Sequence, residues 1–93
     1  MSLQDSVMTA LKAAMKSKDT VALTALRSVK SAILLAQTSG SGAELNEAEE
    51  FKLLQKLVKQ RRDSAAIFTK QNRLDLAEPE LAEVEVISQF LPQ

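Results

Sequence analysis

The sequence predicts an all-α fold, a four-helix arrangement of two helical hairpins with a long third helix. Hydrophobic residues make up 45% of the chain and recur at spacings of three and four, the pattern of helices that bury one side. Only two Gly and two Pro occur, too few for the turns of an all-β protein. The 93 residues have the length of one domain, so we expect residues 1–93 to form a single helical domain.

Two apolar stripes, separated by a polar interruption at residues 17–20, predict the first two helices. Asp19 or Thr20 can cap the second helix, because either side chain can accept a hydrogen bond from an unpaired backbone N–H at the helix start. The positions expected to be buried are Leu3, Val7, Leu11, Ala14 and Met15 in the first helix, and Ala22, Leu23, Leu26, Val29, Ile33 and Leu34 in the second.

A Ser/Gly stretch at residues 38–42 holds both glycines and predicts the longest connection in the chain. Asn46 follows it, with Glu49 three residues later, which is the spacing of a capping box at a helix N-terminus. No helix-breaking residue occurs before Asn72. A third helix of roughly 25 residues, about 40 Å long, is therefore expected.

Pro79 leaves two possible starts for the fourth helix. Asp75 with Glu78 has capping-box spacing, but this start places Pro79 inside the helix, where it removes a hydrogen bond. With Glu78 as the cap, Pro79 takes the first helical position, which proline favours. We expect this second arrangement, preceded by a loose turn. Pro92 is expected to end the fold. The buried side is then formed by Leu81, Val84, Ile87 and Leu91.

The composition excludes several classes of site. Without His or Cys, the commonest general base, thiol nucleophiles and the usual zinc sites are absent. Two glycines cannot build a dinucleotide or P-loop fingerprint, and Ser39 and Ser41 are loop serines without a plausible base. The glutamates at 44–50 are explained by the dipole of the third helix. We expect no catalytic residue, no metal site and no cofactor.

Charge and hydropathy bound the environment of the protein. Twelve basic and twelve acidic residues cancel, so net charge predicts no charged partner. No apolar run reaches the roughly 18–20 residues of a membrane span, and residues 1–5 lack the features of a signal peptide. The absence of cysteine fits a reducing compartment. The sequence therefore predicts a soluble, cytoplasmic protein without membrane contact.

On a helical wheel of the third helix, a row of lysines lies opposite the apolar residues. Lys56, Lys59 and Lys70 fall within about 40° of Lys52, with Asp63 among them. Such a row can follow the phosphates of a nucleic acid. The alternative is that the lysines only solvate the outer face of the helix. The sequence alone favours this alternative, because no aromatic residue accompanies the row for base stacking.

Arg61 falls on the apolar side of the same helix, where a guanidinium must reach solvent or find a carboxylate. Glu80 lies on the apolar side of the fourth helix and Glu83 at its flank. We predict an ion pair of Arg61 with one of these acids, with Arg27 of the second helix as a lesser contender for them. A structural role for the pair, fixing helix register, is favoured over a catalytic one.

Several motifs occur in order along the chain: Lys59-Gln60-Arg61-Arg62-Asp63-Ser64-Ala65, then Phe68, Arg73-Leu74-Asp75-Leu76, Glu80 with Glu83, and Phe90-Leu91-Pro92. Together with Arg27 and Lys30, this order resembles the YqeY family over essentially all 93 residues. The family commonly has Tyr where Phe90 stands. Its members usually continue into a second small helical domain, so the resemblance covers their N-terminal domain and we expect the C-terminal tail domain to be absent.

The resemblance also implies a function. YqeY-like proteins are similar to the C-terminal region of GatB, a subunit of the amidotransferase that corrects mischarged Glu-tRNA or Asp-tRNA. It therefore implies a non-catalytic accessory module that binds tRNA or a tRNA-modifying or aminoacylating enzyme, with Lys52, Lys56, Lys59 and Arg62 as the nucleic-acid contacts. One alternative is a protein-interaction module that uses the Ser/Gly loop and the first two helices. The other is a component of a carbon–nitrogen ligase with glutamine as amido-N-donor. The lack of recognisable catalytic residues argues against this alternative.

Overall fold

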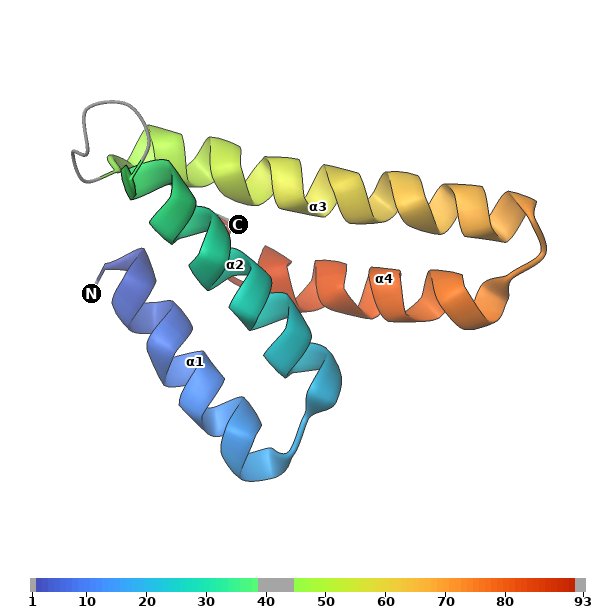
Figure 1. The fold of residues 1–93 in the computed structure, drawn as a ribbon, viewed down its shortest axis with the longest axis horizontal. Helices are drawn as coiled ribbons and strands as arrows, with labels where there is room; N and C mark the ends of the chain where they lie inside the picture. Colours follow the sequence, from blue (N-terminus) through green and yellow to red (C-terminus); the bar gives the residue numbers. More distant parts are fainter. Residues whose placement is uncertain (1, 39–44, 92–93) are drawn as a thin grey trace.

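The computed structural model describes residues 2–38 and 45–91, and these residues form four helices. The helices are α1 (Leu3–Ser17), α2 (Thr20–Thr38), α3 (Glu47–Lys70) and α4 (Leu74–Ser88). The all-α class and the two hairpins with a long third helix are confirmed (Figure 1). With 24 residues, α3 is the longest element. Of the predicted Ser/Gly connection at 38–42, Thr38 is the last residue of α2 and residues 39–42 lie outside the described residues. The last helix ends at Ser88, before Pro92, which also lies outside the described residues.

Side chains cap the beginnings of α1 and α2. The hydroxyl of Ser2 accepts a hydrogen bond of 3.1 Å from the backbone N–H of Asp5. After α1, the chain turns at Lys18, whose φ of 58° is left-handed. The Asp19 carboxylate then accepts a hydrogen bond of 3.1 Å from the backbone N–H of Ala22. Of the two caps considered for α2, Asp19 is therefore the one that is used.

The predicted capping box at the start of α3 is present. The Asn46 side chain accepts a 2.8 Å hydrogen bond from the backbone N–H of Glu49, and the Glu49 carboxylate accepts one of 3.4 Å from the backbone N–H of Asn46. The helix ends at Lys70, and Asn72, with a left-handed φ of 59°, turns the chain toward α4. Asn tolerates this conformation better than most residues that have a Cβ atom.

The start of α4 differs from the prediction. The helix begins at Leu74, so Pro79 lies inside it and Glu78 is not its N-cap. The carbonyl of Arg73 already accepts a 3.1 Å hydrogen bond from the backbone N–H of Ala77, which is buried. The first helical turn, with its buried alanine, therefore forms before the proline, which then removes only one backbone hydrogen bond.

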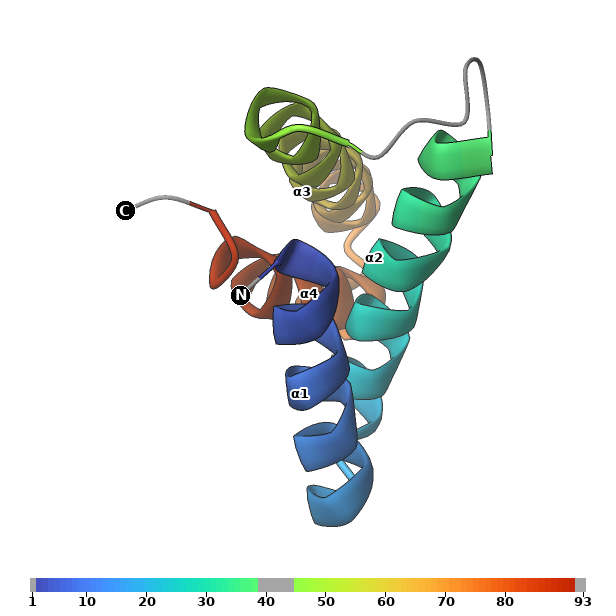
Figure 2. The same cartoon turned by 90° about the vertical axis from the view of Figure 1, so that its left-hand side faces the viewer.

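The four helices form two antiparallel hairpins that cross each other. α1 packs on α2 and α3 packs on α4, and the two hairpins meet chiefly through α2 and α4. In Figure 2, α1 and α2 lie side by side, while α3, above α1, and α4, behind α1, run away from the viewer. The core lies at this crossing and draws on all four helices: Val7, Leu11, Ala14, Ala22, Ala25, Leu26, Val29, Ile33, Leu54, Val58, Val84 and Ile87.

One end of the α3–α4 hairpin extends beyond α1 and α2 (Figure 1). We call this part, residues 62–82, the arm, because none of its residues belongs to the core cluster or packs against that cluster. Two small side chains, Ala65 and Ala77, are buried within it. Alanines at such positions let two helices approach closely, so the arm is held by contacts between α3 and α4.

Three apolar side chains that the stripes place in the core are exposed in the structure. The exposed fractions are 51% for Met15, 47% for Leu34 and 47% for Leu81. Leu81 lies on the arm, where no helix of the other hairpin reaches. Ala25, which the stripe omits, is fully buried. An apolar stripe predicts which side of a helix is buried, whereas its neighbours decide how much of that side they cover.

Candidate nucleic-acid interface

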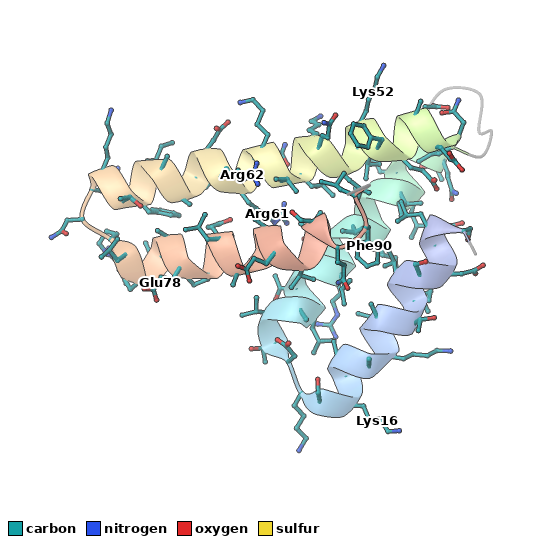
Figure 3. All side chains as sticks on the ribbon, turned by 180° about the vertical axis from the view of Figure 1, so that it is seen from behind. Lys16, Lys52, Arg61, Arg62, Glu78 and Phe90 are labelled. Carbon is teal, nitrogen blue, oxygen red and sulfur yellow. The ribbon has the colours of Figure 1, made fainter. Side chains whose placement is uncertain are left out.

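The lysine row of α3 lies on the side of the helix that faces away from the core. Lys52, Lys56, Lys59 and Lys70 are all exposed, whereas Leu54 on the opposite side is buried. Figure 3 shows Lys52 pointing outward from α3, away from α4. The predicted division of α3 into a basic side and an apolar side is therefore confirmed, while nucleic-acid binding by the row stays a prediction.

Lys59 shares the outer side of α3 with an acid. Its Nζ lies 2.8 Å from Oδ2 of Asp63, one turn further along the helix. The two side chains are 75% and 62% exposed, and such a surface ion pair contributes only about 0–1 kcal/mol. A phosphate group can therefore compete with Asp63 for Lys59 at small cost.

Arg62 lies on a flank of α3 rather than in the row. It is exposed, and it lines a shallow hollow together with Gln55, Lys59 and Leu91. Lys59 stands at the boundary between this flank and the row. The four residues predicted to contact nucleic acid thus cover a broad outer surface of α3 and do not converge on one point.

Arg61 pairs with Glu83, one of its two predicted partners. Its Nε donates to Oε1 of Glu83 at 3.0 Å, and its Nη1 donates to the backbone carbonyl of Leu57 at 3.2 Å. The side chains of Arg61 and Glu83 are only 14% and 15% exposed. In Figure 3, Arg61 lies between α3 and α4, at the base of the arm. The pair thus joins the two helices where the core ends.

The other two residues considered for this ion pair are not part of it. Glu80 and Arg27 form no ion pair with any residue in the ranges 2–38 and 45–91. Arg27 is exposed on α2 and lines a groove between α2 and α3, which Arg61 also lines. Arg27 therefore approaches the same region as Arg61 from the other hairpin without competing for Glu83.

An ion pair that was not predicted from the sequence lies at the turn between α3 and α4. Nε and Nη2 of Arg73 donate to Oδ1 and Oδ2 of Asp75 at 3.1 and 3.0 Å. The hydrogen bond from Arg73 lowers the pKa of the Asp75 carboxyl from 3.8, and the same bond raises the pKa of Arg73. The signal was the spacing of two residues between an arginine at the helix start and an acid in the first turn.

Within 2–38 and 45–91, no group of three or more acidic side chains is arranged to hold a metal ion. Glu49 serves the capping box of α3, and Glu44 lies outside the described residues. None of the described helices is long and apolar enough to cross a membrane. The arrangement on α3 presents several cations that can bind anions by charge.

Comparison with known proteins gives a family and several relatives. A family model described as "Yqey-like protein" matches residues 4–93. The relatives are named "Altered inheritance of mitochondria protein 41, mitochondrial". The protein of this name from Clavispora lusitaniae is 43% identical over 89 residues, which cover 96% of this chain and 51% of the relative. Those from Lachancea thermotolerans and Saccharomyces cerevisiae are 40% and 35% identical over 83 residues, 89% of this chain.

Two facts follow from these relatives. The chain spans about half the length of the curated relatives it matches. It covers 51% of the protein from Clavispora lusitaniae, 44% of that from Lachancea thermotolerans and 45% of that from Saccharomyces cerevisiae. The expected cytoplasmic location is contradicted, because all three relatives are named as mitochondrial proteins. The composition that suggested it, without cysteine or a membrane span, is shared by proteins of several compartments and did not discriminate between them.

Proposed function

The chain belongs to the family of Yqey-like proteins, and on this premise we propose that it is a non-catalytic accessory module that binds tRNA through the basic side of α3. The resemblance of this family to the tail region of GatB implies tRNA as the nucleic acid. The contact residues of the proposal are Lys52, Lys56, Lys59 and Arg62.

The concentration of positive charge on α3 is the observation that carries the proposal. Residues 51–62 include five basic residues and no acidic one, although the whole chain is neutral. Lys52, Lys56 and Arg62 are exposed and form no ion pair with other described residues. At 1.5 Å per residue, the stretch from Lys52 to Lys59 covers about 10 Å, enough to meet successive backbone phosphates.

The surroundings of this surface favour contacts with the RNA backbone over contacts with bases. Phe51 is exposed, but it lies on the flank of α3 beside Glu47 and Glu50, where acids repel a polyanion. Base stacking on aromatic side chains is therefore not part of the proposal. Binding of this kind depends strongly on salt and only weakly on sequence.

The test is binding of bulk tRNA at two salt concentrations by three proteins. One is the wild type and one carries Lys52→Gln, Lys56→Gln and Lys59→Gln. The matched control loses three exposed lysines elsewhere: Lys12→Gln, Lys16→Gln and Lys30→Gln. Each lost phosphate contact makes the negative slope of log K against log salt shallower by about 0.7–0.9. The slope of the α3 variant is therefore expected to be shallower than that of the wild type by about 2–3. Equal losses in the two triple variants, or no binding at low salt, contradict the proposal.

A second candidate is the protein-interaction module, favoured by an apolar hollow over α1 and α2. Exposed Met8 and Leu34 border it, beside the buried Ile33. A partner bound there would be held by apolar contact, so its binding would be insensitive to salt and lost in Met8→Ser with Leu34→Ser. The other alternative, a component of a carbon–nitrogen ligase, gains no support from the residues that the structure describes.

A further inference from the structure

A groove between α2 and α3 gathers polar side chains from the two hairpins. We call it the α2–α3 groove. Its lining comes from one face of each helix, at spacings of three and four residues: Thr24, Arg27, Ser28 and Ser31 from α2, and Leu57, Gln60 and Arg61 from α3. Only one of these side chains is apolar. The groove therefore differs from the apolar hollow over α1 and α2.

The guanidinium of Arg61 is held in place at this groove with donors to spare. Its Nε is occupied by Glu83 and its Nη1 by the carbonyl of Leu57. A guanidinium has five N–H donors in a fixed plane, so three of them are not used by these two contacts. Because Arg61 is largely buried and fixed at two points, a ligand that meets its remaining donors need not order the side chain.

Arg27 supplies the net charge of the groove. The charge of Arg61 is offset by Glu83, whereas Arg27 forms no ion pair within the described part of the chain. The two arginines reach the groove from different hairpins, α2 and α3. Two guanidiniums, one held by two hydrogen bonds and one exposed without an ion pair among the described residues, suit an oxyanion that accepts several hydrogen bonds at once.

The neutral side chains of the groove divide into two groups. The hydroxyls of Thr24 and Ser28 donate to backbone carbonyls one turn earlier, at 3.0 and 3.1 Å. The side chains of Ser31 and Gln60 make no hydrogen bond to any other described residue. Ser31 follows Arg27 by one helical turn and so lies on the same face of α2. Gln60 lines the same groove as Arg61, so both neutral side chains add a donor to the groove.

We propose that the α2–α3 groove binds a phosphate group, with Arg27 and Arg61 as cationic ligands and Ser31 and Gln60 as neutral donors. The site is separate from the lysine row, which lies on the outer side of α3. The phosphate site rests on the proposed function in one respect only, the choice of an RNA backbone as the natural source of the phosphate group. A nucleoside monophosphate or free phosphate offers the same chemistry, and the test separates these sources.

The first measurement is a titration of the 93-residue chain with sodium phosphate, followed by amide chemical shifts, with sodium chloride at matched ionic strength as the reference. Saturable shifts centred on Arg27, Ser31, Gln60 and Arg61 are expected for phosphate alone. In Arg27→Gln, an exposed position, the dissociation constant should rise at least tenfold. Lys30→Gln, an exposed cation on the same helix but outside the groove, should behave as wild type. Equal shifts with chloride, or an unchanged Arg27→Gln, overturn the proposal.

A second series adds adenosine 5′-monophosphate and bulk tRNA. If RNA is the source, Arg27→Gln weakens tRNA binding, while the Lys52/Lys56/Lys59→Gln variant keeps its response to phosphate. If phosphate or the nucleotide saturates the groove but tRNA does not bind, the site stands and the proposed function fails. If tRNA binds through the lysines and phosphate shifts nothing in the groove, the site fails and the proposed function stands.

Discussion

The Nε of Arg61 donates to Oε1 of Glu83 at 3.0 Å and so connects α3 to α4 at the base of the arm. The connection stands between two different kinds of packing. On one side lie the core residues Val58 and Val84, and on the other only contacts between the two helices of the hairpin. An ion pair at this boundary fixes how the two helices align, because no core side chain further out along the arm does so.

The first prediction concerns this ion pair. Arg61→Met leaves the Glu83 carboxylate largely buried without its partner, so the free energy of unfolding should fall by about 2–3 kcal/mol. Breaking a fully buried pair costs about 3–5 kcal/mol, and the remaining solvent access of both side chains lowers the figure. Urea unfolding followed by circular dichroism measures the loss.

The double variant Arg61→Met with Glu83→Leu is the control for this prediction. Removing both charges together leaves no unpaired group, so the double variant should recover most of the loss. If Arg61→Met alone leaves the unfolding midpoint unchanged, the ion pair does not stabilise the fold.

A second prediction follows from the contact between Lys59 and Asp63. Asp63→Asn removes an acid from the lysine row and releases Lys59, so binding of tRNA at low salt should tighten. The gain should be at most about fivefold, since an exposed pair of charges at this separation is worth about 1 kcal/mol. Glu85→Gln, an exposed acid on α4, is the matched control and should change little. Weaker binding by Asp63→Asn would show that the row is not the binding surface.

Pro79 carries the third prediction, because α4 runs through it. Pro79→Ala restores a backbone N–H that can donate to the carbonyl of Asp75, four residues earlier. The free energy of unfolding should rise by about 2 kcal/mol, less than the roughly 3 kcal/mol of a helix interior, because the unfolded chain also becomes more flexible. Pro79→Gly should gain about 1 kcal/mol less. A loss of stability in Pro79→Ala would mean that the proline is needed for the start of the helix.

The fourth prediction concerns the pH dependence of the pair between Arg73 and Asp75. The hydrogen bond from Arg73 lowers the pKa of Asp75 in the folded chain below 3.8. The stabilisation by this pair is therefore complete above the unfolded pKa of the acid and is lost as pH falls through the lower folded value. Arg73 stays charged throughout. In an NMR titration of the carboxyl carbon, Arg73→Gln should raise the pKa of Asp75 toward 3.8, and an unchanged value would contradict the pairing.

The sequence predicts the positions of the helices better than it predicts which of their side chains the other helices cover. The capping box of Asn46 and Glu49 was readable because it depends only on local spacing, and the long third helix followed from the absence of breakers. Pro79 was misjudged because its local preference for a first helical position competes with a helix that has already begun around Ala77. The exposure of Leu81 was not predictable, since it depends on where the other hairpin ends.

For the candidate sites too, features that depend on one helix were predictable and features that depend on helix packing were not. A guanidinium on an apolar helix face must reach solvent or pair with a carboxylate, so Glu83 could be named in advance with one competitor, Glu80. The α2–α3 groove could not, because it depends on how the two hairpins cross and bring Arg27 near Arg61. Helix periodicity orders residues within one helix, and it does not tell which faces of different helices will meet.

The arm is supported at one end only, and this has a consequence for how the native state opens. Its residues contact the neighbouring helix of the hairpin but not the core cluster, so they can separate while the crossing of the two hairpins stays intact. Slow amide hydrogen exchange is expected at Val58 and Val84, and protection should decline outward from them to the turn at Asn72. The chain then has two cooperative units rather than one, divided at Arg61 and Glu83.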